Sequence, residues 1–160
     1  MFTDEQFTAL VKKYIDTVFR VAFSYLKNRE DADDIVQNVF LKLHSHTKPF
    51  ENEEHIRYWL TRVTINECKN LLRAPWRQTE SFEDYAKSLT FDAPMYSDIF
   101  HSVMALPKRY RMALYLYYYE GYSTAEISHI MRIPKGTVCT NLTRGRELLK
   151  KTLQEADSNV

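Results

Sequence analysis

Hydrophobic residues recur every three to four positions along most of the chain, a spacing that predicts amphipathic α-helices. No run alternates hydrophobic and polar residues between turn signals, as a half-buried strand would. The pattern therefore predicts an all-α protein. The expected helices cover residues 3–26, 30–46, 53–72, 96–106, 107–120, 123–131 and 135–153.

Residues 77–95 interrupt this regularity with weak periodicity, scattered acidic side chains and a proline, Pro94, near their end. They predict a linker with room for a short helix over 82–89. We therefore expect two small helical domains, over residues 1–76 and 96–160, joined by an acidic linker.

Near the C-terminus two short helical patterns are separated by a turn. Ser123 and Glu126 have the spacing of a capping box, in which each side chain bonds to the backbone N–H of the other residue. We expect Pro134 to end the helix that starts there, and Lys135 with Gly136 to turn the chain. A second helix then begins near residue 137.

This second helix is amphipathic. Its apolar face, which can dock on the first helix with Gly145 permitting close approach, consists of Val138, Leu142, Gly145 and Leu149. Its opposite face consists of Thr140, Thr143, Arg144 and Glu147. Short polar groups and an arginine on a free face are typical of a helix-turn-helix, whose second helix enters the DNA major groove. A plain helical hairpin with a solvated outer face is the alternative.

The formal net charge is only +1, so any argument for nucleic-acid binding depends on where the charges lie. Residues 57–77 contain five basic side chains and one acidic one, and residues 132–151 contain six and one. Residues 79–107 between them carry five acidic side chains and one basic one. The two basic segments are therefore the candidate nucleic-acid surfaces.

The helix expected over residues 53–72 has a basic face that includes an aromatic ring. This face consists of Tyr58, Arg62, Asn66, Lys69 and Arg73. Cations bind phosphates and aromatic rings stack on unpaired bases, so the face favours melted DNA, with a merely solvated face as the alternative. We expect Trp59 to lie mainly in the core, and the five tyrosines within residues 115–122 to pack between helices.

The helix expected over residues 30–46 carries an acidic and amide-rich stripe opposite its apolar one. The stripe consists of Asp34, Gln37, Asn38 and Leu41. Such a surface suits a protein partner better than DNA, and a merely solvated face is an equal alternative.

Enzymatic and metal-dependent chemistry has no support in the sequence. Cys68 and Cys139 each lie alone in a helical pattern, which indicates a reduced, intracellular protein without a zinc site or disulfide framework. The histidines His44, His46 and His55 lack a matching carboxylate or thiolate pattern. With no nucleophile–base pair or phosphate-binding loop, we expect no enzyme activity, no cofactor and no small-molecule substrate.

Three segments, in this order and spacing, resemble the extracytoplasmic-function group of bacterial RNA polymerase sigma factors. The family's polymerase-clamp helix is similar to "DADDIVQNVFLKL", and its promoter-melting helix is similar to "RYWLTRVTINECKNLLR". Its C-terminal helix-turn-helix is similar to "LPKRYRMALYLYYYEGYSTAEISHIMRIPKGTVCTNLTRGRELL".

The resemblance implies an alternative sigma factor that binds core RNA polymerase and directs it to promoters, under the control of an anti-sigma factor. The N-terminal domain would read and open the −10 element, and the C-terminal domain would read the −35 element. The N-terminus lacks an export signal and no stretch approaches the ~20 apolar residues of a membrane span, so we expect a cytoplasmic protein. The holoenzyme would lie at the nucleoid, and an anti-sigma factor could hold the protein at the membrane.

The resemblance also implies roles for individual positions. The polymerase-binding residues are Asp34, Gln37, Asn38 and Leu41. The −10 residues are Thr47, Lys48, Phe50 and Asn52 in the loop over 47–52 that captures a flipped base, and Tyr58, Arg62, Asn66, Lys69 and Arg73. The −35 residues are Lys135, Thr137, Cys139, Thr140, Thr143 and Arg144, with Arg146, Lys150 and Lys151 as phosphate contacts. The family commonly has basic residues at Cys139 and Asn141, so base reading here leans on Arg144 and Thr140.

A second hypothesis is a self-sufficient helix-turn-helix regulator that binds an operator without polymerase. It predicts a dimer and a palindromic site, whereas a sigma factor binds promoter DNA well only as part of the holoenzyme.

Overall fold

A computed structural model describes residues 2–74 and 98–158 of the chain. The chain divides into two compact units, Met1–Ser88 and Leu89–Val160, and each unit is described by itself. The described residues form helices and no strand, which confirms the all-α prediction. None of the described helices is long and apolar enough to cross a bilayer. The expected linker over 77–95 lies outside the described residues.

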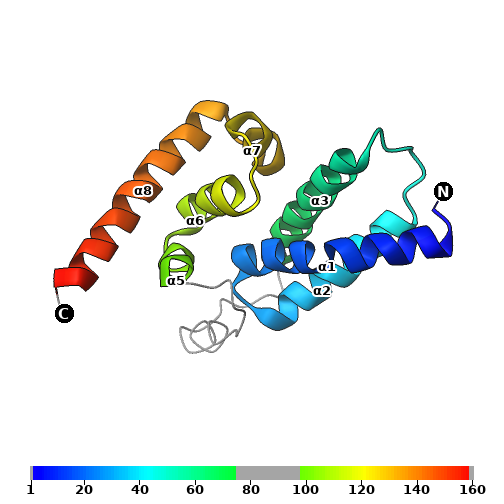
Figure 1. The fold of residues 1–160 in the computed structure, drawn as a ribbon, viewed down its shortest axis with the longest axis horizontal. Helices are drawn as coiled ribbons and strands as arrows, with labels where there is room; N and C mark the ends of the chain where they lie inside the picture. Colours follow the sequence, from blue (N-terminus) through cyan, green and yellow to red (C-terminus); the bar gives the residue numbers. More distant parts are fainter. Residues whose placement is uncertain (1, 75–97, 159–160) are drawn as a thin grey trace. The chain divides into compact units, whose positions relative to one another are not determined.

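Unit 1 is built from three helices that pack against one another, α1 (Asp4–Leu26), α2 (Arg29–His44) and α3 (Glu53–Arg73) (Figure 1). Each helix begins after a residue whose side chain accepts a backbone N–H of the first turn, which satisfies a donor that has no partner within the helix. These caps are Thr3, Asn28 and Asn52. The apolar stripes meet in a core that contains Val21, Leu43 and Ile65, all fully buried.

Unit 2 contains α5 (Asp98–Met104), α6 (Lys108–Leu114), the π-helical segment η1 (Tyr115–Tyr119), α7 (Thr124–Met131) and α8 (Lys135–Ser158). The long helix α8 packs against α5, α6 and α7. Met112, Ile127 and Val138 are fully buried between these helices. The helix expected over 107–120 is thus a short α-helix that widens into a π-helix.

The turn between α7 and α8 differs from the prediction. Arg132, with φ of 57°, takes the left-handed conformation that ends α7, although it is not a glycine. The carbonyl of Pro134 accepts hydrogen bonds from the N–H groups of Thr137 and Val138, at 3.0 and 3.1 Å. The helix therefore begins at Lys135, and the prediction that Lys135 and Gly136 form the turn is wrong. The predicted capping box of Ser123 and Glu126 at the start of α7 is confirmed.

Candidate nucleic-acid and polymerase interfaces

The structure separates the two stripes of α2 as the sequence predicts. Ile35 and Val39 are buried in the core, whereas the four predicted polymerase-binding side chains are exposed: Asp34, Gln37, Asn38 and Leu41. Leu41 exposes 67% of its surface, an unusual position for a leucine in a small domain. A surface with one projecting apolar side chain among short polar ones is suited to a protein partner.

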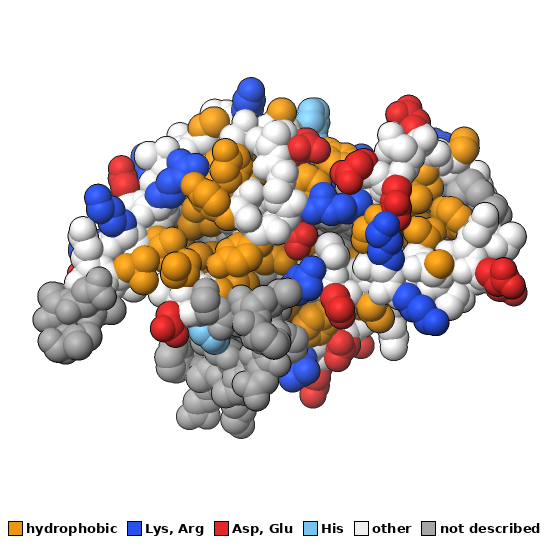
Figure 2. Space-filling model, viewed as in Figure 1, with side chains coloured by type: hydrophobic (Ala, Val, Ile, Leu, Met, Phe, Trp, Pro, Cys, Tyr) orange, Lys and Arg blue, Asp and Glu red, His pale blue; other side chains and the backbone are white. Residues whose placement is uncertain are grey.

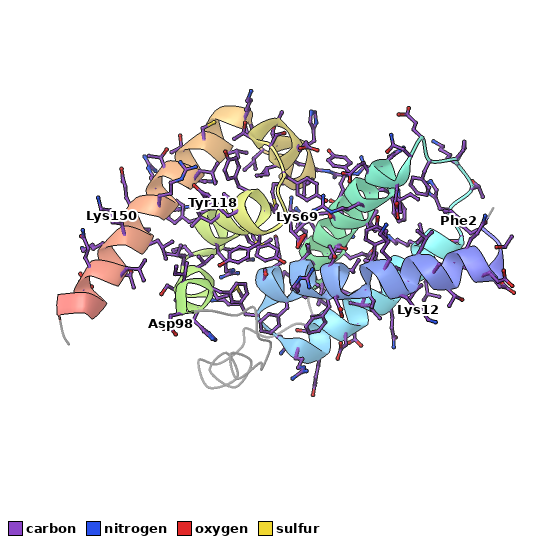
Figure 3. All side chains as sticks on the ribbon, viewed as in Figure 1. Phe2, Lys12, Lys69, Asp98, Tyr118 and Lys150 are labelled. Carbon is purple, nitrogen blue, oxygen red and sulfur yellow. The ribbon has the colours of Figure 1, made fainter. Side chains whose placement is uncertain are left out.

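The basic face of α3 is only partly open to solvent. Arg62 and Arg73 are exposed, whereas Tyr58, Asn66 and Lys69 are half-buried; Figure 3 labels Lys69 on this helix. The one acidic residue of this region, Glu67, forms an ion pair with Lys42 of α2. Because that pair neutralises the Glu67 carboxylate, the net charge of the α3 face remains positive.

The loop over 47–52 leads directly into α3. Thr47, Lys48 and Asn52 are exposed, and Phe50 is half-buried. The Asn52 side chain caps α3 by accepting the backbone N–H of His55 at 2.8 Å. The Nδ1 atom of His55 accepts the backbone N–H of Glu51 at 3.2 Å. Side-chain hydrogen bonds thus fix the junction between the loop and the helix.

Aromatic contacts around Phe50 hold the loop against unit 1. The Phe50 ring centroid lies 4.6 Å from that of His46, 5.1 Å from His55, 5.7 Å from Trp59 and 6.1 Å from Phe2. Trp59 is half-buried in this cluster, so it lies at the surface of the core. The sequence analysis missed the cluster because its members come from the N-terminus, the loop and two helices, which no local periodicity connects.

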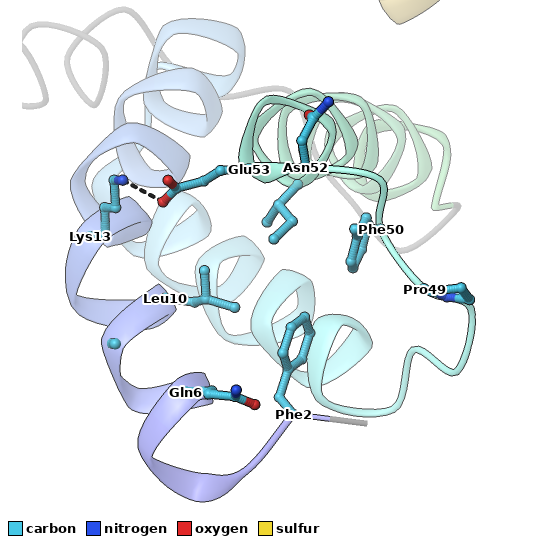
Figure 4. Close-up of a pocket in the computed structure, with 10 residues that line it drawn as sticks. Phe2, Gln6, Leu10, Lys13, Pro49, Phe50, Asn52 and Glu53 are labelled. Atoms are coloured by element: carbon cyan, nitrogen blue, oxygen red, sulfur yellow. Dashed lines mark hydrogen bonds and ion pairs between the residues drawn. The ribbon is translucent and has the colours of Figure 1, made fainter.

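A groove of about 580 Å³ lies beside this loop (Figure 4). Phe2, Leu10, Phe50 and Ile56 give it mainly apolar walls. An ion pair between Lys13 of α1 and Glu53 of α3 lies at its edge. The hydrogen bond within that pair lowers the pKa of Glu53 and raises the pKa of Lys13.

The outer face of α8 carries the residues that were predicted to read DNA. All six are exposed: Lys135, Thr137, Cys139, Thr140, Thr143 and Arg144. Val138 and Leu142 are buried on the inner face as predicted, and Asn141 is buried with them, at 7% exposure. The departure from the family at position 141 therefore lies on the packed side of the helix, and only Cys139 changes the outer face.

Gly145 permits a close approach, but to α6. A Cβ atom at this position would lie 3.0 Å from Leu114 Cδ1 and 3.3 Å from Tyr110 Cβ. The sequence predicted docking on the first helix of the motif, α7, whereas α8 packs against both α6 and α7. The pattern of one amphipathic helix cannot show which of its neighbours occupies the narrowest gap.

Arg146 lies against the tyrosines of η1. Its Nε donates to the hydroxyl of Tyr118 at 2.6 Å, and its guanidinium carbon lies 5.8 and 5.5 Å from the ring centroids of Tyr117 and Tyr118. Tyr117, Tyr118 and Tyr119 expose 36–56% of their surface. The prediction that the tyrosines pack between helices is thus wrong for these three, because the wider π-helical turn changes the direction of side chains. It is correct for Tyr115 and Tyr122, which are buried.

Arg146 and Lys150 also line a second apolar groove, of about 530 Å³, with Ile99, Leu149 and Leu153. Hydrophobic side chains gather beside α8 on the face of unit 2 that Figure 2 shows. Lys150 points outward from α8 in Figure 3. Both cations are exposed, as phosphate contacts must be, but Arg146 is already engaged by an aromatic partner.

The chain matches two protein families in succession. Residues 10–78 match the family described as Sigma-70 region 2, and residues 98–149 match Sigma-70, region 4. The relative SigW, an extracytoplasmic-function (ECF) RNA polymerase sigma factor of Bacillus subtilis strain 168, is 27% identical over 94% of this chain and 90% of its own length. The ECF RNA polymerase sigma-E factor of Escherichia coli K12 is 28% identical over 92% of this chain and 86% of its own.

Two solved structures share the fold. The sigma factor RpoE of Bartonella quintana, in complex with the anti-sigma factor NepR, has a TM-score of 0.69 at 19% identity, with 92% of this chain and 96% of that chain covered. CnrH, in complex with the cytosolic domain of CnrY, has a TM-score of 0.62 at 21% identity, with 96% and 90% covered. Both family regions and the relatives agree across the chain, which belongs to the sigma-70 family and, within it, to the extracytoplasmic-function sigma factors.

Proposed function

We propose that this protein is an alternative sigma factor that binds core RNA polymerase, directs promoter-specific transcription initiation and is controlled by an anti-sigma factor. The carrying observation is the presence, in order, of a region 2 unit and a region 4 unit, each with its own exposed binding surface. The operator-binding alternative is not favoured, because it leaves the whole N-terminal region 2 without a role. A cytoplasmic location accords with this function.

The exposed stripe of α2 is the proposed polymerase-binding surface. Replacing Asp34 with arginine and Leu41 with alanine reverses one charge and removes the projecting apolar side chain, while both positions lie outside the core. The double variant should keep its helical circular dichroism and bind core polymerase more weakly. The matched control is Glu30→Arg, which reverses an exposed charge near the start of the same helix. Undiminished co-purification of the double variant with core polymerase would remove this assignment.

The α3 face and its preceding loop are the proposed −10 surface. Arg62 and Arg73 would bind the DNA backbone, and Thr47, Lys48, Phe50 and Asn52 surround the place where an unstacked base would bind. The apolar groove beside Phe50 gives a flat ring an alternative to stacking in the duplex. Because base–aromatic stacking contributes roughly 1–3 kcal/mol per base, close to the cost of unstacking one, such contacts can favour the melted strand.

A premelted template tests the strand-opening role. Replacing Arg62 and Lys69 with alanine should reduce permanganate-reactive thymines near the start site while duplex promoter binding by the holoenzyme partly remains. On a template already mismatched in this region, transcription by the variant should largely recover. If it does not recover, the α3 face acts in duplex binding or polymerase docking, and its melting role is withdrawn.

The outer face of α8 is the proposed −35 surface. Arg144 can make a bidentate contact to guanine, worth about 1–3 kcal/mol of discrimination, and Thr140 lies one turn before it. Lys135, Thr137, Cys139 and Thr143 complete the exposed face, and Arg146, Lys150 and Lys151 would bind phosphates. Arg144→Ala should relax the preference at one base pair, whereas Lys150→Ala should weaken binding evenly across sequences and lower its salt dependence.

The anti-sigma part of the proposal is supported by the solved structural neighbours, in which RpoE is bound to NepR and CnrH to the cytosolic domain of CnrY. A protein that masks the α2, α3 or α8 surface would block polymerase or promoter binding. Purification of the sigma factor from its native host should therefore recover a stoichiometric inhibitor that abolishes transcription in vitro. A host in which no protein inhibits the purified holoenzyme would contradict this part alone.

A further inference from the structure

The side chain of Tyr110, on α6, is held rigidly beside the outer face of α8. It is buried to 7% exposure, and the Arg109 guanidinium carbon lies 4.6 Å from its ring centroid. On its other side is Gly145, where an added Cβ would lie 3.3 Å from Tyr110 Cβ. Packing on both sides fixes the direction in which the phenol hydroxyl points.

Two arginines meet at that hydroxyl. The Nη2 atom of Arg109 donates to the Tyr110 oxygen at 2.9 Å, and the side chain of Arg144 interacts with the same oxygen from α8. The hydrogen bond from Arg109, with a further contribution from Arg144, holds the pKa of Tyr110 below its ordinary value. Arg144, which is exposed, thus has a contact with a rigid partner outside its own helix.

An anchored arginine differs physically from a solvated one. Its long side chain loses rotamer freedom when it binds a base, and part of this loss is already incurred when a rigid partner restricts the side chain in the free protein. The guanidinium has five N–H donors in a planar fork. Interaction with Tyr110 therefore leaves donors available for the O6 and N7 acceptors of guanine.

Resting on the proposed −35 role of α8, we propose that Tyr110 is a positioning residue that sets base preference through Arg144. Its phenol oxygen holds the guanidinium in the orientation that meets the base edge. Specificity for the −35 element then depends on α6, a helix outside the helix-turn-helix, as well as on α8.

Arg146 and Tyr118 provide a matched control within the same unit. Arg146 also bonds to a tyrosine hydroxyl, but Tyr118 exposes 56% of its surface, and the two residues line the apolar groove. Arg146 is a proposed phosphate contact, which positions the protein without reading sequence. Tyr118→Phe should therefore leave the preference at every base pair unchanged.

The test uses the full chain assembled with core RNA polymerase and a duplex DNA library randomised across the upstream promoter region. Tyr110→Phe removes one oxygen and keeps the ring that packs on Gly145 and Arg109. It should lower the preference at one base pair about two- to tenfold, the range expected when one long side chain must be ordered on binding. Preferences at the other positions should remain.

A double-variant comparison separates this inference from the function on which it rests. If Tyr110 acts through Arg144, then Tyr110→Phe should add nothing in an Arg144→Ala background. An unchanged preference in Tyr110→Phe, or a uniform weakening for all sequences, would overturn the positioning role while leaving Arg144 as a base reader. If Arg144→Ala itself changes no base preference, then the proposed base reading fails and the inference fails with it.

A measurement without DNA addresses the anchoring itself. Relaxation of the Arg144 side-chain Nε–H group in the full-length protein should show greater mobility in Tyr110→Phe than in the wild type. The Arg146 Nε–H group should not change in that variant. Equal mobility of Arg144 in both proteins would overturn the proposal whatever the binding data show.

Discussion

The close approach of α8 to α6 at Gly145 makes a sharp prediction about side-chain size. A valine at this position would bring its Cβ to 3.0 Å from Leu114 Cδ1 and 3.3 Å from Tyr110 Cβ, and its two methyl groups would need further space. Overpacking of a well-packed site costs typically 1–3 kcal/mol. Valine forms helices better than glycine by roughly 0.4 kcal/mol, which offsets only part of this cost. Gly145→Val should therefore destabilise unit 2 by about 1–2.5 kcal/mol.

Hydrogen exchange is the suitable assay, because a chain with two units need not unfold in a single step. The slowest amides of α6 and α8 should exchange roughly 5- to 60-fold faster in Gly145→Val, and those of unit 1 should not change. Gly136→Val is the matched control, since a Cβ at Gly136 meets nothing within 4 Å in the same helix. Equal protection in the two variants would refute the close approach of α8 to α6.

Two further perturbations test particular contacts. Ser123→Ala removes the hydroxyl that caps α7 and should lower the stability of unit 2 by about 0.5–2 kcal/mol, measured as faster amide exchange in α7; unchanged protection would show that the capping box contributes nothing. Lys13→Ala should raise the pKa of Glu53 toward its ordinary value, which an NMR titration of the carboxyl carbon can follow. Because the folded-state pKa of Glu53 is lowered, the pair stabilises unit 1 above the ordinary glutamate pKa. The stabilisation is lost as pH falls through the folded-state value, so the two proteins should converge in stability in acid. A stability difference that persists at low pH would mean that Lys13 acts through packing.

The sequence predicts the helices of unit 1 well because each one depends on local signals. The caps Thr3, Asn28 and Asn52 lie next to strongly periodic segments, and no predicted boundary of α1, α2 or α3 differs from the structure by more than two residues. The exposed stripe of α2 follows from the same periodicity, because its opposite side is completely apolar.

The features that were missed depend on contacts between distant segments or on unusual backbone geometry. The π-helical turn of η1 exposes Tyr117, Tyr118 and Tyr119, and no pattern of period 3.6 predicts such a turn. The left-handed Arg132 replaces the expected glycine turn, since a non-glycine residue can take this conformation at a modest energetic cost when the surroundings favour it.

Side chains of the candidate sites show the same limit. Their exposure on α2 and α8 could be derived from helical periodicity alone, and the structure agrees. The anchoring of Arg144 by Tyr110 and the cluster around Phe50 could not, because they join residues from different helices.

Transcription in vitro tests the central claim most directly. The purified full-length protein should be combined with core RNA polymerase and genomic DNA templates, and the 5′ ends of the transcripts should be mapped. We predict discrete start sites that are absent with core polymerase alone and that share two upstream sequence elements, a −10 and a −35 element. Failure to direct any promoter-specific transcript, together with dimeric binding to a palindromic duplex in the absence of polymerase, would contradict the account.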